Sequence, residues 1–121
     1  MIALGQSATT SRTYRRADGE AFAQLAGAED MIVEAVPEPL IGALFSYLLG
    51  VELPGSGTNY LKQEMTFLHP APFDEVLTAS VEVTRVRPDK HLVDLATVCR
   101  DASGLDICRG RALVLVKDVG A

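Results

Sequence analysis

The sequence predicts an α+β fold in which one long apolar helix is wrapped by a curved antiparallel β-sheet. Large apolar residues recur at helical spacing over residues 40–49, and small residues fill the other side of this segment. After residue 67 the chain reads as long strands, and residues 77–84 alternate between apolar and polar side chains. Because the helix is apolar on most faces, it should be buried by the sheet. The core should contain Leu44, Phe45, Leu48, Leu77, Val81, Val93 and Leu95.

The elements before this helix are shorter. A first strand is expected at residues 8–14, followed by a short helix that Asp18 caps and Gly27 stops. The main helix then begins with Pro39, because proline suits the first helical position, and Gly50 ends it.

The strands after the main helix are separated by turn residues. They are expected at residues 58–69, 77–84, 91–100 and 105–117, and residues 101–104 join the last two as a hairpin. If that turn sets the register, Cys99 lies opposite Asp106 and not opposite Cys108. A disulfide is therefore not implied, and two free thiols suit a cytoplasmic protein.

The bulk composition excludes several classes of protein. A chain of 121 residues is expected to form one domain, residues 1–121, whose core is large enough to be stable without disulfides or a metal ion. Its net charge of −5 argues against nucleic acid as a partner, since such binding relies on Lys and Arg. No apolar stretch reaches the roughly 18 residues that span a bilayer, and the start of the chain lacks a signal-peptide pattern. The cysteine spacing fits no zinc site, and no cofactor is expected.

Several short sequence words are shared with one known family. They are Phe-Ala-Gln-Leu-Ala-Gly at 22–27, Leu-Phe-Ser at 44–46, Leu-Leu-Gly at 48–50, Leu-Pro-Gly at 53–55, Tyr-Leu at 60–61 with Gln63, and Arg-Gly-Arg-Ala-Leu-Val at 109–114. The chain thus resembles the MaoC-like dehydratases and, within them, the short (R)-specific enoyl-CoA hydratases. This resemblance implies a hotdog fold, a hydro-lyase activity on acyl-CoA or acyl-carrier thioesters, and a homodimer with ligand tunnels at its interface.

The resemblance does not extend to the residues that carry the family's chemistry. That family holds the reacting water with the Asp and His of a Gly-Asp-x-Asn-Pro-x-His motif, and a Val-His-Gly word opens its central helix, whose first backbone amides polarise the thioester carbonyl. Counting from Gly27, this chain has Ala28 at the Asp and Val33 at the His. Counting back from Leu44 puts Glu38 at the glycine of Val-His-Gly. Any hydration must therefore use other groups.

Three carboxylates flank the expected pocket and are the catalytic candidates: Asp30, Glu34 and Glu38. A carboxylate can deprotonate water and protonate carbon, which are the two proton transfers of hydration. The alternative is a solvated acidic loop. Glu38 differs from the other two because it lies at the N-terminal end of the main helix, where free N–H groups stabilise a carboxylate. There it could cap the helix or act on the substrate.

Five further residues are candidates for substrate binding, with packing or solvent exposure as the alternative: Leu40, Ser46, Tyr47, Asn59 and Gln63. The first three lie on the main helix, and the other two add polar groups to a strand that borders the ligand tunnel in hotdog proteins. His69 and His91 are expected to be surface histidines. Basic residues near the sheet ends could receive coenzyme A phosphates or remain solvated: Arg85, Arg87, Lys90, Arg100, Arg109 and Arg111.

Three functions therefore stay open. The first is a MaoC-like hydratase or dehydratase with relocated carboxylates. The second is a hotdog acyl-CoA thioesterase in which Glu38 or Glu34 directs water at the thioester carbonyl. The third is a non-catalytic protein that binds acyl-CoA or serves as a partner subunit.

Overall fold

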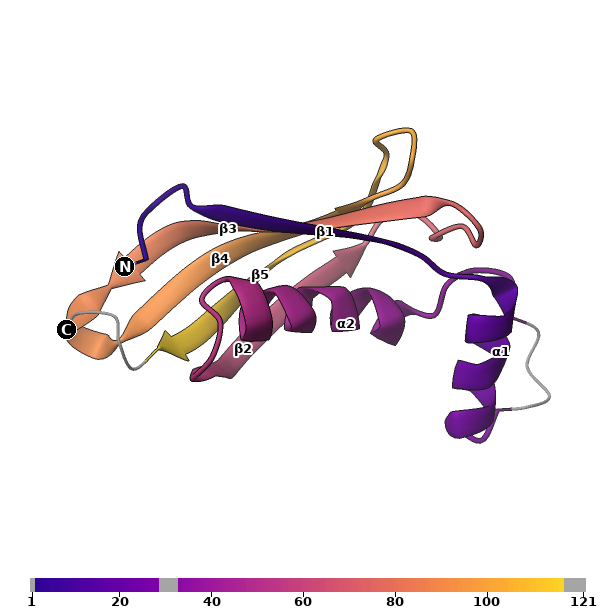
Figure 1. Cartoon of the computed structure of the whole chain (residues 1–121), viewed down its shortest axis with the longest axis horizontal. Helices are drawn as coiled ribbons and strands as arrows, with labels where there is room; N and C mark the ends of the chain where they lie inside the picture. Colours follow the sequence, from indigo (N-terminus) through magenta and orange to yellow (C-terminus); the bar gives the residue numbers. More distant parts are fainter. Residues whose placement is uncertain (1, 29–32, 117–121) are drawn as a thin grey trace.

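The computed structural model of the chain describes residues 2–28 and 33–116 (Figure 1). Its elements in chain order are β1 (Ser7–Thr13), α1 (Arg16–Leu25), α2 (Glu38–Tyr47), a wider helical turn η1 (Leu48–Glu52), β2 (Thr58–Phe67), β3 (Val76–Arg87), a short 3₁₀ turn η2 (Pro88–Lys90), β4 (Leu92–Arg100) and β5 (Asp106–Val116). The strands form one antiparallel sheet in the order β1-β3-β4-β5-β2. The predicted α+β architecture, with a central helix against an antiparallel sheet, is confirmed.

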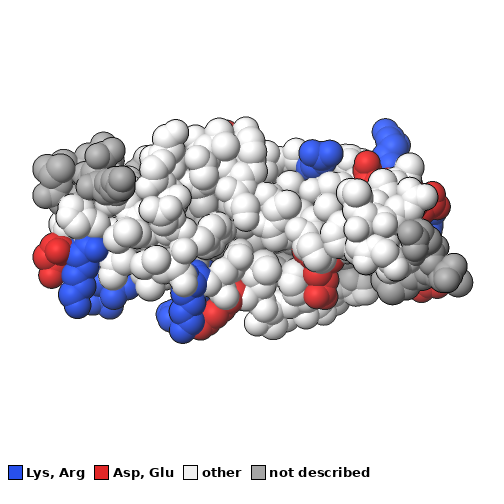
Figure 2. Space-filling model, turned by 90° about the horizontal axis from the view of Figure 1, so that it is seen from below, with Lys and Arg blue, Asp and Glu red and all other residues white. Residues whose placement is uncertain are grey.

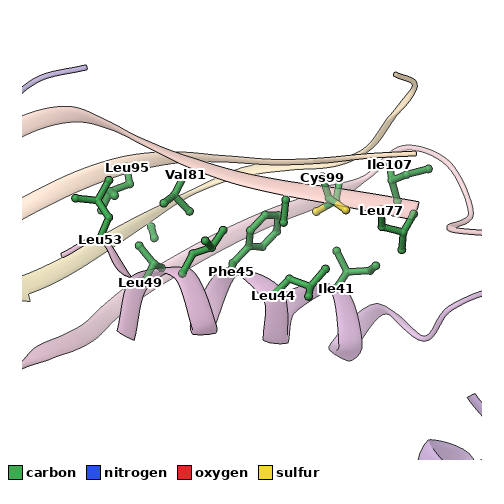
Figure 3. Packing of buried hydrophobic residues seen from close by; sticks show 14 of the residues in the cluster. Ile41, Leu44, Phe45, Leu49, Leu53, Leu77, Val81, Leu95, Cys99 and Ile107 are labelled. Atoms are coloured by element: carbon green, nitrogen blue, oxygen red, sulfur yellow. The ribbon is translucent and has the colours of Figure 1, made fainter. Parts of the chain in front are cut away.

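The core lies between α2 and the face of the sheet along which this helix runs (Figure 1). Ile41 and Phe45 have no exposed surface, and Figure 3 shows their side chains directed from α2 toward the strands. All seven residues that the sequence predicts for the core are buried: Leu44, Phe45, Leu48, Leu77, Val81, Val93 and Leu95. The outer face of the sheet carries the polar half of the alternation, with hydroxyl pairs such as Thr9–Ser80 at 3.1 Å.

The ends of the main helix differ from the prediction. Helix α2 begins at Glu38, so Pro39 occupies the second helical position, and Pro37 precedes the helix without a side-chain capping bond. Gly50 does not end the helical segment, because the wider turn η1 continues it to Glu52. This extra turn keeps Leu48 and Leu49 fully buried, and burial of two leucines favours continued winding over an early stop.

The short helix α1 begins two residues before the predicted cap. Asp18 is the third helical residue, and its carboxylate accepts a hydrogen bond from the backbone N–H of Arg15 at 2.8 Å. The prediction that Asp18 is the cap is therefore wrong, although its side chain does bond to the free end of the helix. Gly27 follows the helix with φ at +75°, the left-handed conformation that glycine adopts without strain, so the predicted stop is confirmed.

The register of the β4–β5 hairpin also differs from the prediction. Arg100 pairs with Asp106, but Cys99 pairs with Cys108, because Ile107 is an extra residue that bulges from β5. The prediction of Asp106 opposite Cys99 is therefore wrong. The bulge buries the Ile107 side chain as well as Cys108, which gives a physical reason for it. Both cysteines are free thiols, and burial raises the pKa of each thiol to about 11.

None of the helices in the described part of the chain has both the length and the apolar character that crossing a membrane requires. Residues 2–28 and 33–116 also contain no cluster of three or more His, Cys, Asp or Glu side chains that could hold a metal ion.

Candidate functional site

An open groove of about 640 Å³ runs between α2 and the edge strand β2. Helix α2 turns small residues toward this strand, so the two elements do not close on each other. A Cβ atom added at Gly42 would lie 3.5 Å from Met65 Cε, which shows how glycine preserves the width of the groove. The lining consists of Glu38, Pro39, Gly42, Ala43, Ser46, Gln63, Met65 and Phe67. The walls are thus apolar along most of their length, with polar groups at a few points.

The pairing of β2 with β5 decides which β2 side chains reach the groove. Tyr60 pairs with Val114, and a one-residue irregularity then follows before Lys62, which places Gln63 and Met65 on the α2 side. Without that extra residue Gln63 would face outward, because neighbouring side chains of a strand point to opposite faces. Asn59, by contrast, lies on the outer face and is exposed. The structure therefore brings Gln63 to the groove and leaves Asn59 outside it.

The amide of Gln63 is the most informative polar group in the groove. Its Nε2 atom is buried and has no hydrogen-bond partner in the structure. A buried amide N–H without a partner is costly, so a ligand oxygen beside it would be stabilised. Nearby, burial raises the pKa of the Tyr60 phenol, and a hydrogen bond with the Ser46 side chain opposes that rise. The Gln63 amide is thus the polar group of the groove that is left to bond a ligand.

A second hollow of about 400 Å³ lies at the N-terminal end of α2. Its lining residues are Ala35, Val36, Pro37, Glu38, Ile41, Phe67, Leu68, His69, Pro70, Ala71 and Ile107. Glu38 and Phe67 line both the hollow and the groove, so they stand where the two spaces meet. The charge of Glu38 also contributes to the raised pKa of the Cys108 thiol, after the larger effect of burial, which places this carboxylate near β5.

His69 enters the second hollow from the chain segment after β2. Its ring Nδ1 lies 2.9 Å from the backbone carbonyl oxygen of Asp106. A carbonyl oxygen can only accept a hydrogen bond, so Nδ1 carries the hydrogen and Nε2 is the acceptor of the neutral ring. Sequence reasoning predicted an exposed histidine, which is confirmed, but missed its place. The position follows from the Val36 N–H, which donates to the Ala71 carbonyl at 2.9 Å and draws residues 69–71 beside the start of α2.

The positions that the resemblance aligns with the family's Asp and His contribute nothing to either space. Ala28 and Val33 line neither the groove nor the hollow. The Val33 carbonyl accepts a hydrogen bond from Arg16 at 3.0 Å, and a Cβ atom at Gly19 would lie 3.0 Å from the Val33 side chain. This residue is thus packed against α1. The side chain at this position therefore cannot transfer a proton, and it does not reach either space.

The remaining predicted site residues are dispersed. Glu34 is exposed and lines neither space, and Asp30 lies outside the described residues. The Leu40 carbonyl accepts a hydrogen bond from the Tyr14 hydroxyl at 3.0 Å, which gives this residue a packing role. Tyr47 lines a separate hollow beside β1. Of the five predicted binding residues, only Ser46 and Gln63 thus lie in the groove.

Four of the basic side chains considered for phosphate binding are held in ion pairs: Arg87 with Asp94, Arg100 and Arg109 with Asp106, and Arg111 with Glu64. By contrast, no Lys or Arg in the described part of the chain pairs with Glu38. The carboxylate at the junction of the two spaces is therefore available to water or a ligand.

No protein-family model matches the chain. It is 34% identical to an (R)-specific enoyl-CoA hydratase of Aeromonas caviae over 93% of this chain and 94% of that protein. A second (R)-specific enoyl-CoA hydratase, from Rhodospirillum rubrum, is 30% identical over 95% of this chain and 88% of the other. The solved structure of the (R)-hydratase from A. caviae superposes with a TM-score of 0.84, covering 95% and 97% of the two chains. The fold is therefore the hotdog fold, and the chain belongs to the (R)-specific enoyl-CoA hydratase family.

Proposed function

We propose that this protein adds water to a 2-enoyl thioester, or removes it from the 3-hydroxyacyl thioester, in the groove between α2 and β2. The observation that carries the proposal is the buried, unpartnered Nε2 of Gln63 in an otherwise apolar groove that ends at a carboxylate. Sequence similarity to hydratases over nearly the whole chain supports the same reaction class. The acyl group is carried by coenzyme A or an acyl-carrier protein.

The groove offers each part of such a substrate a matching surface. The apolar part of the substrate that lies in the groove runs along Ala43, Met65 and Phe67, whose side chains exclude water from it. Gln63 lies four β2 residues, roughly 13 Å, from Phe67 at the Glu38 end of the groove. Its Nε2 therefore donates a hydrogen bond to an oxygen of the carrier arm, while the thioester lies at Glu38. Glu38 stands at the end of the groove and moves the proton.

A panel of thioesters separates this function from its alternatives. With crotonyl-CoA, we expect a slow loss of enoyl absorbance without release of free thiol. The rate should be on the order of a hundredfold to ten-thousandfold below that of relatives with the Asp/His pair, because Ala28 and Val33 transfer no proton and the Glu38 carboxylate must carry both proton transfers alone. Thiol release from saturated acyl-CoAs would instead indicate a thioesterase, and binding without turnover would indicate a binding protein. Turnover equal to that of the Asp/His enzymes would contradict the positions given to Ala28 and Val33.

We also propose a homodimer in the cytoplasm. Strand β2 is an edge of the sheet, and it and the residue after it expose Tyr60, Leu61, Met65 and Leu68. Figure 2 views the molecule from the α2 side, and much of the middle of this face is free of charged side chains. An unpaired edge strand with exposed apolar groups favours pairing with a second copy. The two free thiols support a reducing compartment.

Light scattering should give about twice the mass of one 12.9 kDa chain. Leu61→Glu should shift the protein toward the monomer, because the charge would lie on the exposed edge at β2, where Leu61 is 54% exposed. Leu105→Glu serves as the matched control, since Leu105 is 43% exposed in the β4–β5 turn, away from that edge. A wild-type protein that stays monomeric at all accessible concentrations would contradict the dimer.

A further inference from the structure

We propose that His69 and Glu38 together hold the reacting water and replace the proton-transfer pair that this chain lacks. The inference rests on the proposed function and adds a residue that sequence reasoning assigned to the surface. Both side chains line the second hollow, at the N-terminal end of α2. Glu38 also lines the groove, so the hollow supplies water at the junction of the two spaces, where C3 of the substrate lies.

The histidine is fixed in one orientation by contacts to β5. Its ring Nδ1 bonds the Asp106 carbonyl at 2.9 Å, and the backbone N–H groups of Leu68 and His69 lie 2.8 and 3.4 Å from the Ile107 carbonyl. Asp106 is itself held by ion pairs to Arg100 and Arg109. With Nδ1 occupied as a donor, the neutral ring presents Nε2 as an acceptor, and a water molecule in the hollow can donate to it.

The carboxylate has the complementary placement. Glu38 is in the first turn of α2, and like Phe67 it lines both the hollow and the groove. No side-chain hydrogen bond within the described residues involves it. A water molecule between the two side chains donates one hydrogen to His69 Nε2 and the other to the carboxylate. Both lone pairs of its oxygen are then free, and one of them attacks C3 at the junction with the groove.

The addition balances with these two groups alone. The water oxygen forms a bond with C3 while one O–H bond breaks, and that proton passes to the Glu38 carboxylate. The electron pair of the C2–C3 double bond moves toward C2 and the thioester carbonyl. Glu38 then returns the proton to C2, which restores the carboxylate and leaves a hydroxyl on C3 that donates to His69 Nε2. Dehydration follows the same steps in reverse.

Two variants of His69 test the roles of its two ring nitrogens one at a time. The side-chain amide of His69→Asn can keep the donor to Asp106 but has no group at the position of Nε2. His69→Gln places an amide oxygen near the position of Nε2 and so keeps an acceptor for water. We expect His69→Asn to lower kcat for crotonyl-CoA at least about a hundredfold with KM changed by less than about threefold. His69→Gln should retain more activity, because the role requires an acceptor and not a proton carrier.

The matched control is His91→Asn. His91 is the other histidine, follows η2 with φ at +56°, and lines neither the groove nor the second hollow. Asparagine tolerates this left-handed conformation, so the variant should fold and keep wild-type turnover. The double variant Glu38→Gln/His69→Asn should be no more than about threefold slower than the slower single variant, since groups that act as a unit are not additive.

The outcomes distinguish the pair from the reaction itself. A wild type that never consumes enoyl absorbance would overturn the proposed function and this inference with it. A wild type that turns over while His69→Asn keeps its full rate would overturn the pairing alone. Losses that multiply in the double variant, or a His69→Asn loss accompanied by an equal loss of butyryl-CoA binding and of Tm, would also overturn it. If His69→Asn does not fold, His69→Gln decides the matter: a rate below one hundredth of wild type counts against the acceptor role.

Discussion

Glu38→Gln should lower the rate of crotonyl-CoA hydration at least about a hundredfold while leaving the fold intact. Glutamine matches glutamate in shape, but it cannot take a proton from water and return it to carbon. Because Glu38 lies in the first turn of α2, the stability change should come from the lost charge near the positive end of the helix, about 0.3–1 kcal/mol. The measurement is steady-state turnover of the variant beside its urea unfolding curve.

A second glutamate provides the control for this substitution. Glu52 is exposed at the end of η1, far along the helical segment from the hollow, so Glu52→Gln should keep wild-type turnover. Equal rates for the wild type and Glu38→Gln, in an assay where the wild type clearly turns over, would remove Glu38 from the mechanism. Glu34 and Asp30 would then be the carboxylates to test.

The largest loss of stability is expected from Gly110→Ala. A Cβ atom at this position would lie 1.8 Å from the Glu64 carbonyl oxygen and 2.8 Å from the Glu64 carbonyl carbon, both of which are backbone atoms. Strand β5 could accept a methyl group only by moving away from β2. Overpacking of this severity should cost about 3 kcal/mol or more, a large share of the 5–15 kcal/mol that typically separates folded from unfolded chains. Urea unfolding monitored by circular dichroism would measure it.

Gly50→Ala is the matched substitution for comparison. No neighbouring atom lies within 4 Å of the position where a Cβ at Gly50 would stand, and its φ is not in the left-handed region. Alanine there should be neutral or stabilise the fold by up to about 1 kcal/mol, since it restricts the unfolded chain. If the free energy of unfolding of Gly110→Ala is within about 1 kcal/mol of the wild-type value, β2 can move away from β5 without destabilising the fold, and the prediction is wrong.

Local periodicity was sufficient to predict the elements and the core. Residues 40–49 and 77–84 carry their structure in the spacing of their side chains, which depends only on neighbours along the chain. The two sheet irregularities were not predictable in this way. The bulge at Ile107 makes Cys108, and not Asp106, the partner of Cys99. The irregularity between Tyr60 and Lys62 turns Gln63 toward the groove. Each depends on what the opposite strand presents.

The candidate site shows the same division between local and long-range information. Glu38 could be singled out from the sequence because the start of a helix is a local feature. His69 could not be linked to it, because the two are brought together by the Val36–Ala71 backbone contact. Asn59 and Tyr47 were plausible from residue type alone, but strand register and helix rotation turn them away from the groove.

The two thiols that face each other at the hairpin end of β4 and β5 report when these strands separate. With a pKa of about 11, each native thiol is ionised at pH 7 in only about one molecule in ten thousand, and neither cysteine has exposed surface. An alkylating reagent therefore reacts mainly with molecules in which β4 and β5 have separated. The rate of modification would then measure how often the hairpin end of β4 and β5 opens, without any added probe, and a ligand in the neighbouring groove should slow it.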